Sequence, residues 1–454
     1  MNRNPSLVEE ADAFLAAHPG IRHLDAFIID ICGNAVGKRY PAAEIRNLYT
    51  KGSTLCASTQ LLDVQGNSWD TAGLGFSDGD PDAPSMPIPG TLAPVPWAPE
   101  PRAQCLLTLD EPGGTAPLWY DPRVILGSVA GRFAELGLSP VVAVELEFYL
   151  IDRERAGDGA PQPPASPRTG TRDWAGKVFG MEVLEEFGEV IGAIEAACLA
   201  QGLPVTTIIS EYGPGQFEVN LAHLPDPVRA ADHAALLRRA VREVARSRDM
   251  DATFMAKPYG ELSGSGLQVN LSLLDGEGNI FDPRRGDGEA RLGQAIAGMQ
   301  AALAESMAIF APDLNAYRRF EANQFTPVTT DWGANNRSVA FRVPDSAPEN
   351  RRIEHRAGGA EANPYLVMAA VLAAAHHGLA NRLTPTAPGS GNVGEEADPA
   401  LPLRLWSALE HLERAAILPG YLSRRYLDAY VHVKRAELDA FMAAILPREY
   451  AWYL

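Results

Sequence analysis

Two glutamates, Glu145 and Glu147, stand two residues apart in the segment VVAVELEF (141–148). Successive side chains of a strand point to opposite faces, so both carboxylates lie on one face, roughly 7 Å apart. Carboxylates at that spacing repel one another, and beside a buried wall they are costly unless a cation lies against them. A divalent metal ion would supply that charge. The alternative is a strand end with two solvated glutamates, and this octet alone does not decide between the two.

Two later segments could place more polar side chains beside this pair. In EYGPGQFEVN (211–220), the Gly-Pro-Gly turn can bring Glu211 and Glu218 to one polar surface. GSGLQVNLSL (264–273) alternates apolar and polar residues, and its polar face carries Gln268, Asn270 and Ser272. Taken alone, the first segment is typical of a loop with two exposed acids and the second of a half-solvated antiparallel strand.

Arginines concentrate between residues 318 and 356. Strand alternation in RRIEHR (351–356) places Arg352, Glu354 and Arg356 on one face. Arginine binds phosphate and carboxylate through paired hydrogen bonds. A surface ion-pair network is the alternative, but the apolar residues Val339, Phe341, Val343 and Ile353 indicate that these strands are buried. The arginines are Arg318, Arg319, Arg337, Arg342, Arg351, Arg352 and Arg356.

These pieces predict one sheet whose polar face holds several arginines and five carboxylates. Oxygen ligands without cysteine or histidine favour Mg²⁺ or Mn²⁺ over zinc. Metal ions with arginines suit phosphoryl transfer, in which positioning and charge neutralisation provide most of the catalysis. The five carboxylates are those of Glu145, Glu147, Glu211, Glu218 and Glu354.

The elements that position these residues fall into two parts. The Gly/Pro-rich stretch 63–101 separates early strands from later ones, and Glu-Pro-Gly-Gly at 111–114 breaks the pattern. We therefore predict domains at 1–112 and 113–454. Strands are expected at 23–30, 35–40, 105–110, 141–148 and 205–210, and helices at 7–17, 121–137, 182–202, 226–248, 363–380 and through the last sixty residues.

The overall composition excludes several classes of protein. The net charge of −18 over 454 residues argues against non-specific binding to nucleic acid or to an anionic membrane. The four cysteines are scattered without a CxxC pair, which suits a reducing compartment. No apolar run is long enough to span a bilayer, and the N-terminus lacks a signal-peptide core. We expect a cytoplasmic protein.

The motifs, in their order along the chain, resemble those of glutamine synthetase, and most closely its γ-glutamyl-polyamine and γ-glutamyl-amide synthetase branch. The resemblance covers nearly the whole chain and implies an α+β fold. It implies a small β-grasp-like N-terminal domain and a large catalytic domain with a curved antiparallel sheet flanked by helices. The motifs are VELEF, EYGPGQFE, ATFMAKP (252–258), GSGLQVNLSL, NNRSVAFRVP (335–344), RRIEHR and ANPYLVMAA (362–370).

The resemblance also implies an activity. A ligase of this family phosphorylates the γ-carboxylate of glutamate with ATP, and an amine then displaces the phosphate. The resemblance implies two metal ions, a double ring of two stacked hexamers, and active sites between neighbouring subunits. It implies Glu147, Glu211 and Glu218 at one metal, and Glu145, Glu354 and residue 268 at the second. It implies Arg319, Arg356 and Gly264 at the amino acid, and Arg337, Arg342 and Arg352 at the phosphates. We also expect Ser272 at ATP, and by position alone His223 near the adenine.

The chain departs from the family pattern at four positions. Gln268 replaces a histidine ligand of the second metal, and Asn270 replaces a histidine that contacts substrate phosphate. Phe325 stands where ammonium-using members carry a glutamate, and Ala57 aligns with their aspartate. An ammonium pocket needs negative charge to concentrate the cation and take its proton. Loss of both acids predicts an organic amine with an apolar or aromatic part as the nucleophile. The alternative that acids elsewhere in the site bind a polyamine stays open.

Two further readings stay open. The same mechanism could act on a different carboxylate, because Phe179 stands near the position of a substrate-binding tyrosine. A catalytically silent assembly protein is the third reading, and the loss of two active-site histidines supports it. Against it, a silent protein has no physical need to keep five acids on one surface.

Overall fold

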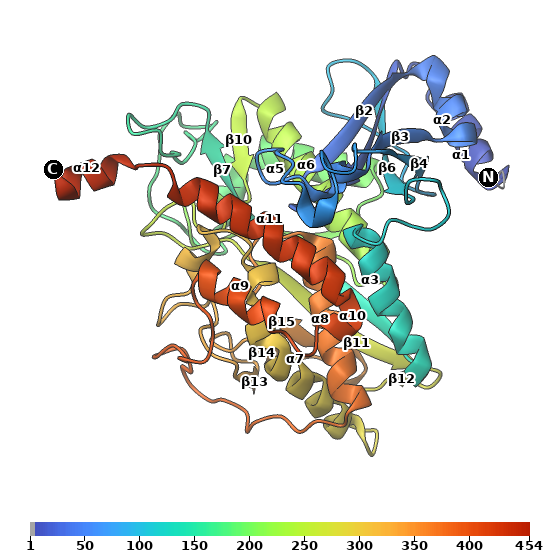
Figure 1. The fold of residues 1–454 in the computed structure, drawn as a ribbon. Helices are drawn as coiled ribbons and strands as arrows, with labels where there is room; N and C mark the ends of the chain where they lie inside the picture. The colour runs from blue at the N-terminus through green and yellow to red at the C-terminus, as the bar shows by residue number, and fades with distance from the viewer. Residues whose placement is uncertain (1–4) are drawn as a thin grey trace.

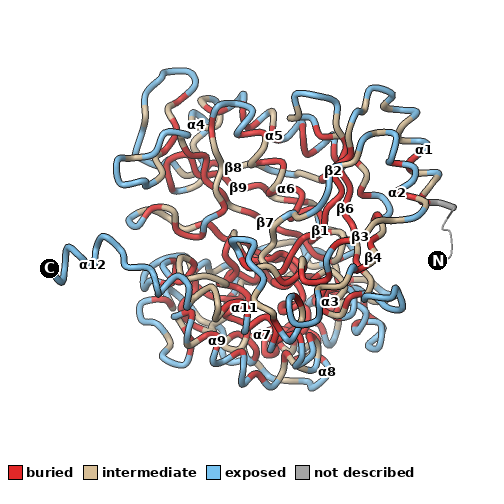
Figure 2. Tube along the Cα trace, turned by 45° about the horizontal axis from the view of Figure 1, so that its top comes forward, coloured by how far each residue is buried: buried red, intermediate tan, exposed pale blue. Residues whose placement is uncertain are grey.

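The computed structural model describes residues 5–454 and contains two β-sheets (Figure 1). The first sheet belongs to the N-terminal part of the chain, and the second organises the rest. Helices pack around the second sheet, and the buried residues lie between these layers (Figure 2). This is the α+β architecture that the sequence predicts.

The N-terminal sheet has the strand order β2-β1-β6-β4-β3, with β5 paired to β6. β1 and β6 run parallel, and the other neighbours run antiparallel. Helices α1 (Pro5–Ala17) and α2 (Ile45–Lys51) lie beside this sheet. The strands are β1 (His23–Ile29), β2 (Ala35–Pro41), β3 (Ser53–Cys56), β4 (Asp82–Pro87), β5 (Ala93–Pro94) and β6 (Arg102–Leu109).

The second sheet has the order β13-β14-β15-β11-β7-β9-β8, with β10 on β7 and β12 on β11. All of its pairings are antiparallel except β13 with β14. The predicted strand at 141–148 lies at its centre, within β7. The strands are β7 (Ser139–Asp152), β8 (Val205–Ser210), β9 (Gln216–Leu221), β10 (Met250–Thr253), β11 (Leu267–Asp275), β12 (Gly278–Asn279), β13 (Trp332–Ala334), β14 (Phe341–Val343) and β15 (Ile353–His355).

Long helices support this sheet. α6 packs against β7 and β10, α7 and α8 pack side by side, and α12 projects from the body at the C-terminus (Figure 1). The helices are α3 (Pro122–Gly131), α4 (Met181–Glu186), α5 (Gly188–Ala200), α6 (Pro227–Ser247), α7 (Gly288–Phe310), α8 (Pro364–Ala380), α9 (Leu405–Glu413), α10 (Pro419–Leu422), α11 (Arg424–Met442) and α12 (Pro447–Tyr453).

The predicted helix starts are confirmed where a capping side chain precedes a proline. Asp121, Asp226 and Asn363 each accept a backbone N–H from the first helical turn. Two predictions were wrong in detail. The helix expected at 182–202 is divided into α4 and α5 at the buried Phe187, and the helix from 121 continues as a 3₁₀ turn from residue 132. Helix α7 was not predicted at all.

Several polar contacts join the two parts of the chain. Asn363, the cap of α8, donates from Nδ2 to the carbonyl oxygen of Asp30 at 2.8 Å. Arg239 on α6 donates to the Asp25 carboxylate at 3.1 Å. The predicted boundary at residue 112 lies between the two sheets, and we retain it as a proposal. Across residues 5–454, no helix combines the length and apolar character that a membrane crossing requires.

The two roles of Asn363 predict an unusually costly substitution. Asn363→Ala removes a helix cap and a buried hydrogen bond to Asp30, so we expect a loss of about 2–3 kcal/mol in the free energy of unfolding. Asp226→Ala removes an exposed cap alone and should cost about 1 kcal/mol. Urea denaturation at equal protein concentration measures both. Equal losses would show that the contact with Asp30 adds nothing.

Candidate active site

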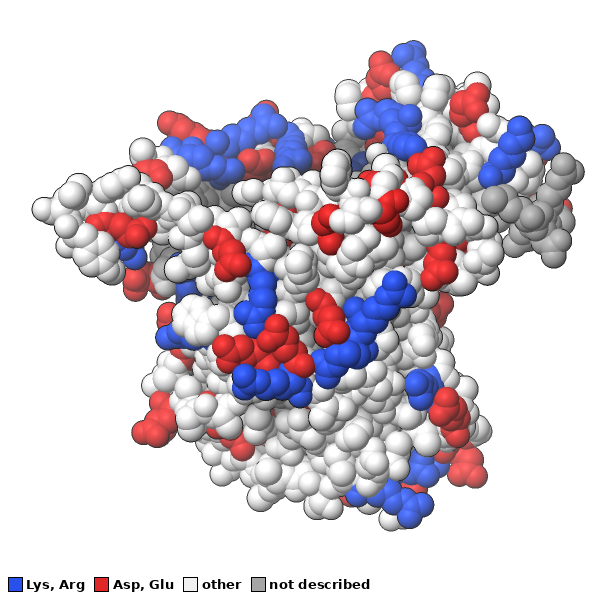
Figure 3. All heavy atoms as spheres, viewed as in Figure 1, with Lys and Arg blue, Asp and Glu red and all other residues white. Residues whose placement is uncertain are grey.

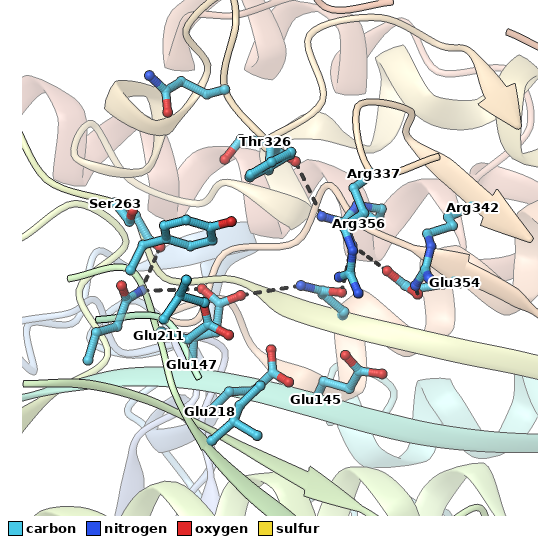
Figure 4. A pocket seen from close by; sticks show the side chains of 18 of the residues that line it. Glu145, Glu147, Glu211, Glu218, Ser263, Thr326, Arg337, Arg342, Glu354 and Arg356 are labelled. Carbon is cyan, nitrogen blue, oxygen red and sulfur yellow. Dashed lines mark hydrogen bonds and ion pairs between the residues drawn. The ribbon is translucent and has the colours of Figure 1, made fainter. Parts of the chain in front are cut away.

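A cavity of about 420 Å³ opens on the polar face of the second sheet. Four glutamates, Glu145, Glu147, Glu211 and Glu218, lie on one side of it (Figure 4). Arg337, Arg342 and Arg356 lie on the other side together with Glu354 (Figure 4). The cavity therefore has an acidic half and a half rich in arginine.

Strand register creates the acidic half. β7 and β9 pair with Glu147 directly opposite Glu218, while the buried Phe148 pairs with the buried Phe217 on the core side. Like charges directly opposite one another destabilise a sheet. The apolar side chains nevertheless hold the register, because a slip of one residue would move the glutamates into the core.

Burial and mutual repulsion raise the pKa of these carboxyls. The pKa of Glu211 is raised to about 7, first by desolvation and then by the charge of Glu147. The pKa of Glu218 is raised well above its usual range by burial and by repulsion from the other glutamates. Burial is also the main cause of the raised pKa values of Glu145 and Glu147. A cation placed among these groups would remove most of this penalty.

The arginine half is already partly neutralised. Glu354 is 2% exposed, and its carboxylate pairs with both Arg342 and Arg356. Arg319 is 4% exposed, and its Nε has no hydrogen-bond acceptor among the described residues. Its Nη1 reaches only the carbonyl oxygen of Ala357, at 3.4 Å. Arg337 lines the cavity and forms no ion pair within residues 5–454. Arg319 and Arg337 are thus the guanidinium groups most available to an anionic ligand.

Most of the predicted site residues line this one cavity. They come from β7, β9, β11, β14, β15 and the segments between or next to these strands, and Phe325, which is 52% exposed, lies at the cavity edge. The predicted residues in the lining are Glu145, Glu147, Glu211, Glu218, Gly264, Gln268, Arg319, Phe325, Arg337, Arg342, Arg352, Glu354 and Arg356.

Four predicted residues lie outside the lining. Asn270 lies behind it, bonded to Glu145 and Arg352, and Ser272 donates to the carbonyl oxygen of Arg351 at 3.0 Å. Desolvation lowers the pKa of His223, and the nearby charge of Arg352 lowers it further. Ala57 is 2% exposed within the N-terminal domain, and its carbonyl oxygen accepts from the Tyr120 hydroxyl. The cavity of the single chain does not include Ala57, whose place in the amine site stays a prediction.

The sequence interpretation missed several lining residues. Lys257 is 7% exposed, lies in the ATFMAKP motif and adds a cation beside Gly264 and Arg319. Tyr212 packs on Phe325 with ring centroids 5.9 Å apart. The spacing of Lys257 and Tyr212 carried no signal, because each stands in or beside a loop whose path the sequence does not specify. Phe179, already expected near a substrate-binding position, also lines the cavity, with a positive φ of 56°.

The donor set suits a hard divalent cation. The acidic half offers carboxylate and amide oxygens and no thiolate or imidazole, and Mg²⁺ and Mn²⁺ prefer such oxygen ligands. Within residues 5–454 no three His, Cys, Asp or Glu side chains are arranged to hold an ion as they stand. Repelling carboxylates separate when no cation lies between them, so binding would draw them together.

The molecular surface shows no extended basic area on the face of Figure 3. Lysine and arginine side chains there alternate with aspartate and glutamate (Figure 3). Of the cavity arginines, Arg319 and Arg356 are buried, whereas Arg337 is exposed at the opening. This distribution favours a small anionic ligand over a nucleic acid on that face.

Buried carboxylates facing arginines in one cavity are typical of an enzyme that handles phosphate. The catalytic-domain model of glutamine synthetase matches residues 119–453. Gamma-glutamylputrescine synthetase PuuA from Escherichia coli (strain K12) is 38% identical, over 100% of this chain and 96% of its own length. Glutamate–isopropylamine ligase from Pseudomonas sp is 33% identical, over 94% and 93%. A solved structure of apo GmaS without ligand superposes with a TM-score of 0.82 at 27% identity, covering 97% and 98% of the two chains.

The chain therefore belongs to the glutamine synthetase family, whose members are ATP-dependent ligases that use divalent metal ions. The predicted family and fold are confirmed. The roles of individual site residues stay predictions.

The raised pKa of Glu211 predicts a pH dependence of stability without metal. An unfolded glutamate ionises near 4.5 and the folded Glu211 near 7, so the folded chain keeps a proton that the unfolded chain has released. Stability should therefore fall as pH rises from about 4.5 through about 7. Thermal unfolding in EDTA across this range measures it.

Two comparisons make that prediction specific. Glu211→Gln should flatten the pH profile, whereas Glu9→Gln on the exposed surface of α1 should leave it unchanged. Saturating Mg²⁺ should raise the melting temperature more above pH 7 than below pH 5. A metal-free profile that rises over the same range would contradict the electrostatic account.

Proposed function

We propose that this protein is an ATP-dependent ligase that joins the γ-carboxylate of glutamate to an organic amine. One observation carries the proposal: a single cavity sets four buried or half-buried glutamates against a group of arginines, in a chain of the glutamine synthetase family. Two relatives named above are likewise called a gamma-glutamylputrescine synthetase and a glutamate–isopropylamine ligase.

We assign the parts of the cavity by charge. Glu147, Glu211 and Glu218 would hold Mg²⁺ or Mn²⁺, which would neutralise phosphate charge during transfer. Arg337, which has no ion pair among the described residues, would meet the ATP phosphates together with Arg342 and Arg352. Arg319, Arg356 and the backbone at Gly264 would meet glutamate, and Lys257 adds positive charge there.

The reaction then has two balanced steps. An oxygen of the glutamate γ-carboxylate attacks the γ-phosphorus of ATP, the bond to the β-phosphate oxygen breaks, and ADP leaves. The amine nitrogen next attacks the activated acyl carbon, phosphate leaves with the bonding electrons, and the nitrogen loses a proton. Arginines pre-placed around the phosphate stabilise the charge that develops, and they need no reorganisation during transfer.

The cavity edge supports an organic amine over ammonia. Phe325 and Tyr212 form an aromatic pair, and both side chains are about half exposed toward the opening. Such rings favour an apolar group, or a second cationic group through cation–π contact. The putrescine enzyme among the relatives is the specific observation that favours a diamine as the second candidate.

We propose a homo-oligomer of six or twelve chains, as the family resemblance implies. Apolar side chains are exposed along the C-terminal segment, including Phe441, Ile445 and Trp452. Exposed apolar groups in one segment favour burial against another chain. The four cysteines are unpaired, which supports the expected cytoplasmic location.

Phosphate release from ATP tests the function. With Mg²⁺ and glutamate, we expect release that requires an organic amine and is weak with ammonia. The panel should contain ammonia, alkylamines, aromatic amines and diamines, and mass spectrometry should identify the amide. Ammonia activity equal to that of the best amine would overturn the organic-amine assignment. Nucleotide binding without release for any acid and amine would favour the silent-protein reading.

Phe325 provides a specific test of amine selectivity. Phe325→Glu replaces an apolar wall with an anion, so kcat/KM for an apolar amine should fall about tenfold or more while ammonia use rises relative to it. Phe325→Leu keeps an apolar side chain and is the matched control. Equal effects of the two variants on every amine would mean that the ring does not contact the nucleophile.

A further inference from the structure

The family resemblance assigns two sets of side chains to two metal ions, and the two sets differ in the charged groups that contact them. The first set, Glu147, Glu211 and Glu218, forms no ion pair within residues 5–454, and repulsion among its members adds to the burial cost. Glu147 accepts hydrogen bonds only from neutral groups, whereas in the second set Glu354 and Gln268 are bonded by arginines and Glu145 by the amide of Asn270. The second set consists of Glu145, Gln268 and Glu354.

Glu354 has both carboxylate oxygens occupied. Oε2 accepts from Nη1 of Arg342 at 2.6 Å, and Oε1 accepts from Nη1 of Arg356. Two guanidinium groups thus face one carboxylate that is 2% exposed. A metal ion at this carboxylate would have to displace one cation and lie close to the other.

Gln268 points the NH₂ group of its amide, and not its oxygen, toward the glutamates, so it offers no metal ligand there. Its Oε1 accepts from Nη1 of Arg356 at 3.0 Å, and its Nε2 donates to Oε1 of Glu147 at 3.3 Å. Arginine can only donate and an ionised carboxylate can only accept, so the neighbours determine this orientation. If the amide rotated to offer its oxygen to a metal, its NH₂ group would face the N–H donors of Arg356, and its oxygen would face the carboxylate oxygen of Glu147. Both hydrogen bonds would then be lost.

Asn270, two residues further along β11, also bonds to a glutamate on one side and an arginine on the other. Its Nδ2 donates to Oε1 of Glu145 at 2.8 Å, and its Oδ1 accepts from Nε of Arg352 at 2.9 Å. Strand β11 lies between β7 and β15, so its two amides bridge the glutamates of one neighbour and the arginines of the other. Two of these four hydrogen bonds join the amides to the acidic half, and the other two join them to the arginine half.

We propose that, without nucleotide, each chain binds one divalent ion, at Glu147, Glu211 and Glu218, and that Arg342 and Arg356 take the place of a second ion. Gln268 and Asn270 are then positioning residues: Gln268 orients Arg356, and Asn270 orients Arg352. The inference rests on the metal site of the proposed function and adds the number of ions and the role of the amides.

Counting bound Mn²⁺ by electron paramagnetic resonance, with no nucleotide or amino acid present, tests the inference. We expect one tight ion per chain in the native protein and at least tenfold weaker binding in Glu218→Gln. Gln268→Met, which keeps the side-chain length but removes both hydrogen bonds, should retain the count of one. Two ions of similar affinity, or loss of the ion in Gln268→Met, would overturn the inference.

A gain of binding makes the test sharper. Arg342→Met removes one of the two cations at Glu354, so a second Mn²⁺ should become measurable, with affinity at least tenfold above any second site in the native protein. No second ion in Arg342→Met would overturn the assignment of that position to the arginines. No bound ion in the native protein would overturn the metal site of the proposed function as well, whereas two ions would overturn only the present inference.

Substrate binding separates positioning from general damage. Gln268→Met should raise the KM for the acid about tenfold or more with little change in the dissociation constant of ADP. Asn270→Leu should instead raise the dissociation constant of ADP with little change in the KM for the acid, because Asn270 holds Arg352, which we assign to the phosphates. Equal effects of both variants on both ligands would mean that the amides only stabilise the fold.

Discussion

Repulsion among carboxylates on neighbouring strands is the constraint on which the site depends. Glu147 faces Glu218 across the β7–β9 pair, and the apolar residues between them pack into the core. Because side chains alternate, a one-residue shift of register would relieve the repulsion only by burying glutamates among apolar groups. Packing therefore holds the anions together, and the missing positive charge must come from a ligand.

The arginine half of the cavity carries excess positive charge and therefore requires an anionic ligand. Its guanidinium groups are carried by short strands and loops, and Glu354 lies between two of them. Neutral amides on β11 connect the halves without adding charge. A ligand with an anionic end and a bound cation would satisfy both halves in one orientation only. The charge pattern, more than the cavity shape, thus favours a metal-bound phosphate compound over a simple anion.

Alternation in the sequence predicted β7, β9 and β11 and placed Glu145 with Glu147 and Glu354 with its arginines, whereas Glu211 was placed by the Gly-Pro-Gly turn. Alternation could not predict how far a side chain reaches, so Asn270 was expected at the substrate but lies behind the cavity wall. Helix α7 was missed because it is buried at most of its positions, which weakens the amphipathic pattern. Ala57, aligned through a loop, is buried in the N-terminal domain.

The same electrostatic constraint bears on the choice of amine. A free ammonium ion would be drawn to the acidic half, but a divalent ion there neutralises the charge that attracts it. No carboxylate replaces that charge at Phe325, where the cavity edge is aromatic instead. Once the metal is bound, attraction must come from contact with the rings of Tyr212 and Phe325, and contact energy grows with the apolar area that the amine buries. Ammonia offers almost none of that area, so metal binding and an aromatic edge together favour a substituted amine.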